Sequence, residues 1–139
     1  MFKQGEKLSV YVIEDSKIIC DILLRLPLFI ENVRVTTFIN GESALESIKK
    51  SLPDVIILDY YLNTGLKQNI NGDEVLKSIK QISPEIPVII LSGLADPQKI
   101  KQLHDIGVNG FIHKSEENLL DNIVESLKGL SENKEISLQ

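Results

Sequence analysis

The chain has 139 residues, of which 42% are hydrophobic, and a formal net charge of −5 at pH 7. This length predicts one domain with its own hydrophobic core, over residues 1–128, followed by a polar tail over 129–139. The acidic balance argues against direct binding to nucleic acid or to an anionic membrane, because both depend on an excess of Lys and Arg.

The single cysteine, Cys20, excludes an intramolecular disulfide framework. It lies in a helical apolar pattern, which favours a buried core thiol. No apolar run reaches the ~18 residues of a membrane span, and residues 1–7 lack the apolar centre of a signal peptide. These features predict a cytoplasmic location.

Five short apolar segments, separated by helical patterns, are predicted to form strands. They cover residues 8–13, 33–38, 54–59, 87–92 and 110–113. This alternation implies right-handed crossovers and a doubly wound parallel sheet with helices on both faces. We therefore expect a flavodoxin-like α/β fold, a three-layer sandwich around a five-stranded parallel sheet of order 2-1-3-4-5.

Five helices are predicted from apolar residues at helical spacing and from end signals such as a capping Asn or Asp, a proline or a glycine. They begin near Ser16, Asn40, Gly72, Asp96 and Ser115. The first is expected to end or kink at Pro27, the third to stop at Pro84 and the fourth at Gly107. The tail that starts at Gly129 is expected to fray.

Acidic residues stand at the carboxyl ends of two predicted strands: Glu14 and Asp15 after the first, and Asp59 at the end of the third. Parallel sheets bind ligands at this edge, so the three carboxylates should converge there. At ~4 Å two carboxylates repel by roughly 4 kcal/mol at a surface-like dielectric, which a cation or a retained proton relieves. The cluster predicts Mg²⁺, which prefers oxygen ligands. Interaction of single acids with helix dipoles is the alternative, but it explains three together poorly.

A hydroxyl and an ammonium are predicted to face the same crevice. Ser92 closes the fourth strand, and Lys114 follows the fifth. With the carboxylates they would form a phosphoryl pocket, in which an Asp attacks phosphorus and the other groups position it and neutralise charge. Taken singly, either residue could be an ordinary loop residue.

With these residues in place, the chain resembles the receiver domain of two-component response regulators over residues 8–128. The resemblance rests on Glu14-Asp15, Asp59, Ser92-Gly93 and Lys114, each at the end of the expected strand. It implies that Asp59 is the phosphoacceptor, that Asp15 binds Mg²⁺ directly and that Glu14 acts largely through water. It also implies that the backbone carbonyl of Tyr61 is a metal ligand and that Lys114 holds the phosphoryl group or the Asp59 carboxylate.

The same resemblance assigns switching roles and partners. Ser92 would move toward a phosphoryl oxygen, and Phe111 stands where the family keeps an aromatic switch residue. Core packing is an equally good interpretation of Phe111, because Phe lacks the hydroxyl of tyrosine. The implied partners are a sensor histidine kinase or histidine phosphotransfer protein, as donor, and an unidentified downstream protein.

The chain departs from the family pattern in three places. About five extra residues lie within 63–71, before Gly72, where a lid, a partner contact and a tolerated insertion are all open. Ser115 follows Lys114 where many receivers have a proline, which removes the usual reason for a cis peptide. The acidic pair is Glu-Asp rather than Asp-Asp, which should leave metal binding intact.

The leading hypothesis is a signalling domain that promotes its own phosphorylation and dephosphorylation, rather than an enzyme acting on a separate substrate. A pseudo-receiver that binds partners without phosphorylation is the alternative. A haloacid-dehalogenase-type phosphatase fits less well, because Glu14-Asp15-Ser16 lacks its pair of Asp residues two positions apart. A flavodoxin-like or dinucleotide-binding function is disfavoured, since two acids after strand one would repel phosphate. His104 and His113 have no ligand at zinc spacing.

Overall fold

The computed structural model describes residues 7–62, 72–93, 97–114 and 117–138, with side chains up to residue 130. Five parallel strands form one sheet of order β2-β1-β3-β4-β5, which confirms the predicted topology. The strands are β1 (Leu8–Ile13), β2 (Val33–Phe38), β3 (Val55–Asp59), β4 (Val88–Ser92) and β5 (Gly110–His113). The helices are α1 (Lys17–Leu23), α2 (Gly41–Lys50), α3 (Gly72–Ile82), α4 (Pro97–Ile106) and α5 (Leu119–Leu138), with a short 3-10 helix, η1 (Leu26–Leu28), after α1.

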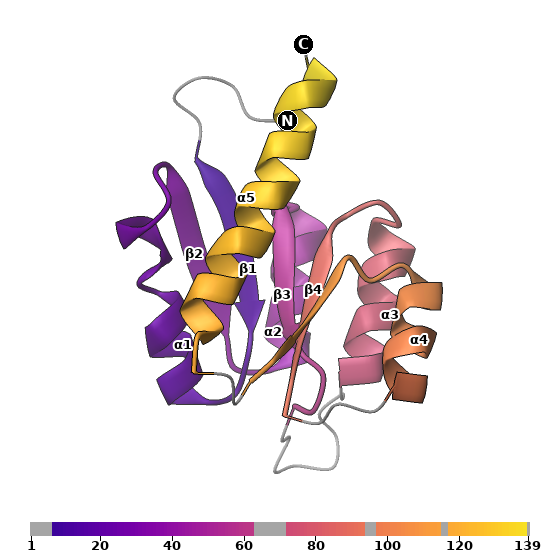
Figure 1. Cartoon of the computed structure of the whole chain (residues 1–139). Coiled ribbons are helices and arrows are strands. Elements are labelled where there is room, and N and C mark those ends of the chain that lie inside the picture. Colours follow the sequence, from indigo (N-terminus) through magenta and orange to yellow (C-terminus); the bar gives the residue numbers. More distant parts are fainter. Residues whose placement is uncertain (1–6, 63–71, 94–96, 115–116, 139) are drawn as a thin grey trace.

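Helices cover both faces of the sheet, which gives the predicted three layers (Figure 1). On one face, buried side chains of α2, α3 and α4 pack against the sheet, among them Ile48, Leu76 and Leu103. On the other face, α1, η1 and α5 form a second core cluster with the same strands. β3 and β4 are buried at every position, as expected for central parallel strands covered on both sides.

Several helix ends follow from the residues that predicted them. The Ser16 side chain accepts a hydrogen bond from the amide of Ile19 and caps α1, and Asn40 Oδ1 caps α2 through the Ser43 amide at 2.9 Å. Gly107 follows α4 with φ 107°, a conformation that side-chain-bearing residues rarely adopt. The predicted cap Asp96 lies outside the described residues.

Two strands begin one residue later than predicted. Just before β3, Asp54 contacts β1 twice: its carboxylate accepts from the Ser9 amide at 2.7 Å, and its amide donates to the Ser9 carbonyl at 2.8 Å. Pro87 has no amide hydrogen to donate, and its carbonyl accepts from Ile56 before β4 begins at Val88. Both residues therefore bond to the neighbouring strand just outside the strand boundaries.

Two helices differ from the prediction in length. The first ends at Leu23, before Pro27, which instead lies inside η1. The last begins at Leu119 and continues to Leu138, so the tail that was expected to fray is helical. Apart from Gly129, the residues from Lys128 to Leu138 include no strong helix breaker, so the local sequence allows α5 to continue to Leu138. The domain boundary at residue 128 stays a prediction.

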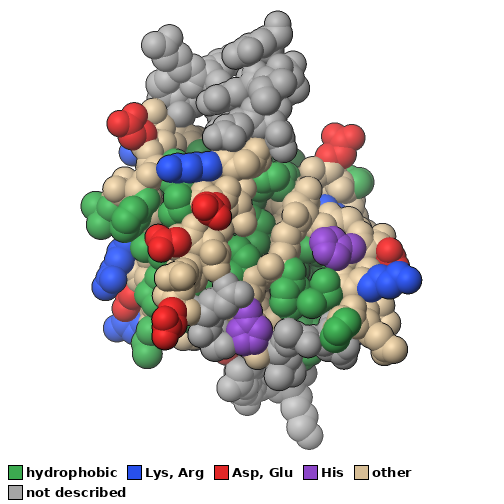
Figure 2. Space-filling view, viewed as in Figure 1, with side chains coloured by type: hydrophobic (Ala, Val, Ile, Leu, Met, Phe, Trp, Pro, Cys, Tyr) green, Lys and Arg blue, Asp and Glu red, His purple; other side chains and the backbone are tan. Residues whose placement is uncertain are grey.

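The surface agrees with the acidic composition. In Figure 2 acidic side chains lie over the α5 side of the molecule, and Lys and Arg are scattered rather than gathered on this face. Asp121 and Glu125 of α5 are both exposed. Among the described residues, no helix is both long enough and apolar enough to cross a membrane.

Candidate functional site

The predicted acidic cluster forms at the carboxyl ends of the strands. Glu14 and Asp15 follow β1, Asp59 ends β3, and carboxylate oxygens of the three residues all lie within 4.8 Å of one another. The neighbouring pairing of β1 with β3 brings them together, since Ile13 stands opposite Leu58 in the ladder. Glu14 and Asp59 are 0% and 1% exposed, so two of the three carboxylates are removed from water.

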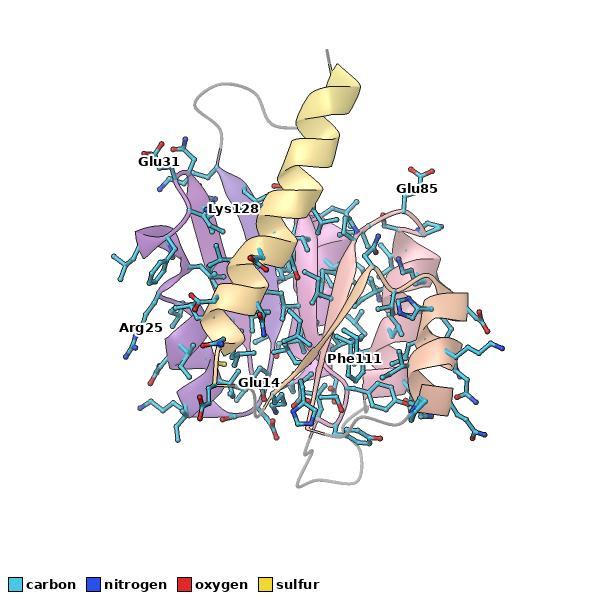
Figure 3. All side chains as sticks on the ribbon, in the orientation of Figure 1. Glu14, Arg25, Glu31, Glu85, Phe111 and Lys128 are labelled. Carbon is cyan, nitrogen blue, oxygen red and sulfur yellow. The ribbon has the colours of Figure 1, made fainter. Side chains whose placement is uncertain are left out.

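The ammonium of Lys114 bridges the two buried carboxylates. Its Nζ donates to Glu14 Oε2 and to Asp59 Oδ2, both at 3.2 Å, and lies 3.0 Å from Glu14 Oε1 in an ion pair. Glu14 Oε1 nevertheless has no hydrogen-bond partner, because that ion-pair contact lacks hydrogen-bond geometry. Figure 3 labels Glu14 near the end of the sheet where these strands finish. Lys114 therefore lies beside the acidic cluster, as predicted.

Burial dominates the electrostatics of Glu14. Removal from water raises the pKa of Glu14 from 4.5 to about 8; the hydrogen bond from the Ser16 amide opposes this shift and the charge of Asp59 adds to it. Burial would lower the pKa of Lys114, but its contacts with Glu14 and Asp59 outweigh burial and raise that pKa. The site thus holds an excess of negative charge that one ammonium compensates only in part.

The other predicted site residues surround this cluster. Ser92 is 1% exposed at the end of β4, and its carbonyl accepts from the Lys114 amide at 2.8 Å. The Tyr61 amide donates to Asp59 Oδ1 at 3.1 Å, while its side chain is about half exposed, at 47%. Phe111 on β5 is half-buried against the α3 and α4 core (Figure 3). These positions agree with the predicted crevice but leave each proposed role untested.

Two contacts at the site were not predicted. The Ser16 amide donates to Glu14 Oε2 at 3.0 Å, and the buried Cys20 thiol donates to the Glu14 carbonyl at 3.3 Å. Both fix the turn that leads from β1 into α1. A cap position such as Ser16 does not reveal from sequence which side chain its amide will meet. His104 is exposed on α4, and the segment 63–71 and Ser115 lie outside the described residues.

Comparison with known proteins identifies a family that agrees with this site. The family described as "Response regulator receiver domain" matches residues 10–126. A comparison with curated proteins finds no match.

Solved structures agree with that family. The phosphorylated cyanobacterial phytochrome response regulator RcpA is 26% identical, with a TM-score of 0.72 over 91% of this chain and 92% of its own. The BeF3-activated receiver domain of DrrB is 26% identical, with a TM-score of 0.69 over 88% and 98%. NtrX from Brucella abortus, in complex with ADP, is 25% identical, with a TM-score of 0.74 over 94% of this chain and 29% of its own. The family match spans most of the chain, and the sheet order and acidic edge agree with it, so this chain belongs to the response regulator receiver domain family.

Proposed function

We propose that this receiver domain accepts a phosphoryl group on Asp59 and that the resulting acylphosphate alters a surface that binds a downstream protein. One observation carries the proposal: Asp59 is buried at the end of β3, beside two other acids, with its Oδ2 only 3.2 Å from Lys114 Nζ. The solved structures of RcpA and DrrB are described as phosphorylated and as BeF3-activated, which supports a phosphoryl-binding role for a member of the same family.

The transfer would use groups already at the site. A carboxylate oxygen of Asp59 would attack the phosphorus of a phosphohistidine, forming a P–O bond while the P–N bond breaks and its electron pair returns to the imidazole. Lys114 would pair with one phosphoryl oxygen, and the Ser92 hydroxyl would donate to another. Both groups would stabilise the negative charge of the phosphoryl oxygens as the phosphoryl group moves to Asp59.

The acidic cluster suits Mg²⁺. Its oxygens converge within 4.8 Å, and Glu14 Oε1 is a buried acceptor with no hydrogen-bond partner. We propose that Asp15 and Asp59 hold Mg²⁺ directly, Glu14 largely through water and Tyr61 through its backbone carbonyl. When bound, Mg²⁺ would neutralise phosphoryl oxygens and relieve the repulsion among the carboxylates.

The proposed partners follow from this chemistry. The donor would be a sensor histidine kinase or a histidine phosphotransfer protein in the cytoplasm. Ser92 and Phe111 would carry the change from the acylphosphate to the surface that the downstream protein binds. The domain would promote its own phosphorylation and dephosphorylation without acting on a separate substrate.

Phosphorylation by a small donor tests the proposal. Incubation with acetyl phosphate or phosphoramidate and Mg²⁺ is expected to add one phosphoryl mass to the wild type, as intact-mass spectrometry would show. Asp59→Asn should abolish the addition, whereas Asp121→Asn, which changes an exposed acid on α5, should leave it unchanged.

Two results would contradict the assignment. A phosphoryl group that persists in Asp59→Asn would point to another acceptor. A folded wild type that accepts nothing from either donor would favour a binding module that works without phosphorylation.

A further inference from the structure

A second polar cluster lies next to the site and has no role in the chemistry above. Tyr60, the residue after Asp59, is only 5% exposed, and its hydroxyl donates to Asp73 Oδ1 at 2.8 Å. The Nζ of Lys99 lies 5.3 Å from the centre of the Tyr60 ring. Asp73 belongs to the first turn of α3 and Lys99 to the start of α4, so one side chain connects β3 to both helices.

The charges in this cluster are complementary. The phenol of Tyr60 donates to the carboxylate of Asp73, and the ammonium of Lys99 lies over the ring of the same tyrosine. The contact with the Tyr60 hydroxyl, in turn, raises the pKa of Lys99. An ammonium, a neutral phenol and a carboxylate are thus arranged in sequence from α4 to α3.

The backbone of Tyr60 also contacts neighbouring elements. Its amide donates to the carbonyl of Leu91 at 2.9 Å, one residue before Ser92. Its carbonyl lies against Gly72, where any Cβ would fall within 2.8 Å of Tyr60 Cα and closer still to the carbonyl. Tyr60 therefore touches the ends of β3 and β4 and the first turn of α3, and its position is tied to α3.

We propose that the contact between Lys99 and Tyr60 is a latch that holds α4 in the resting conformation and is released by phosphorylation. The inference rests on the proposed function of Asp59. A phosphoryl group there would draw the Ser92 hydroxyl toward it and displace the end of β4, which leads into α4. Tyr60 is retained on α3 by Asp73 and by the tight approach to Gly72, so Lys99 is the member of the cluster that moves away.

Hydrogen exchange in the resting protein tests whether the latch exists. Lys99→Met and Tyr60→Phe are expected to speed amide exchange across residues 97–106 by roughly two- to five-fold, the scale of one cation–aromatic or hydrogen-bond contact. Lys99→Arg keeps the cation and should restore wild-type exchange. Lys101→Met, on the exposed side of α4, should have no effect there.

Binding of beryllofluoride with Mg²⁺ then tests the coupling to the site. A contact that stabilises only the resting state opposes the activated one, so its loss should tighten binding. Lys99→Met should bind the mimic roughly two- to five-fold more tightly than the wild type, and Lys101→Met should match the wild type. Equal exchange and equal binding in Lys99→Met and the wild type would overturn the latch alone. A wild type that does not bind the mimic at all would instead overturn the proposed function.

Discussion

Mg²⁺ is expected to raise the stability of this protein, and to do so more strongly as the pH rises toward 8. The cation would replace repulsion among three converging carboxylates with attraction. A ligand that binds only the native state stabilises it by ~2.7 kcal/mol at 100 times its dissociation constant. Thermal melting across a Mg²⁺ titration measures the effect, and Asp15→Asn should reduce it sharply.

The pH dependence follows from Glu14. Its pKa is raised from 4.5 to about 8 in the folded protein, so the native state binds this proton more tightly than the unfolded chain does. The stabilisation that results is fully present below pH 4.5 and is lost as the pH rises through about 8. Each unit of pKa difference corresponds to about 1.4 kcal/mol, so the loss without metal is of the order of a few kcal/mol. Mg²⁺ competes with the proton, and its affinity should therefore rise over the same range.

Glu14→Gln isolates this contribution. The variant keeps the size of the side chain but cannot ionise, so without metal it should be more stable than the wild type at pH 8 and should lose less stability between pH 5 and 8. Its affinity for Mg²⁺ should fall and change little with pH. If the melting temperatures of the wild type and Glu14→Gln differ by the same amount at every pH, the proton on Glu14 does not control the stability of the site.

Most of the fold was predictable because the central strands β3 and β4 are short and apolar up to their last residue, and because each polar site residue stands at or just after a strand end. Parallel order then brings Glu14, Asp59 and Lys114 together without any information about their side chains. The strength of these signals comes from burial: β3 and β4 have no exposed position that could interrupt the pattern.

Contacts between elements distant in sequence could not be predicted in the same way. Tyr60, Asp73 and Lys99 look like an interior aromatic and two surface charges, and only the packing of α3 and α4 makes them one cluster. Even a contact between residues close in sequence can depend on side-chain geometry: the ammonium of Lys80 donates to the carbonyls of Pro84 and Ile86, at 3.3 and 2.8 Å, and supports the turn from α3 to β4. Side-chain reach of this kind depends on three-dimensional distance and not on spacing in the chain.

A large effect of a single added methyl group is expected at Gly72. A Cβ there would fall within 2.8 Å of three backbone atoms of Tyr60, closer than real contacts allow. Backbone cannot rotate away as a flexible side chain can, so either α3 or the end of β3 must move. Overpacking of this kind typically costs about 1–3 kcal/mol and occasionally more. Because Asp59 precedes Tyr60 directly, Gly72→Ala should also slow phosphorylation by a small donor.

Two other glycines supply matched controls for the same substitution. At Gly93 and Gly129 an added Cβ meets nothing within 4 Å. Gly93→Ala should change stability by less than about 0.5 kcal/mol. Gly129 lies inside α5, where alanine is favoured over glycine by about 1 kcal/mol, so Gly129→Ala should stabilise the protein. In denaturant unfolding, the free energy of unfolding should therefore fall for Gly72→Ala, stay unchanged for Gly93→Ala and rise for Gly129→Ala. If Gly72→Ala unfolds at the wild-type midpoint and still takes up phosphate at the wild-type rate, the close approach of α3 to Tyr60 does not position Asp59.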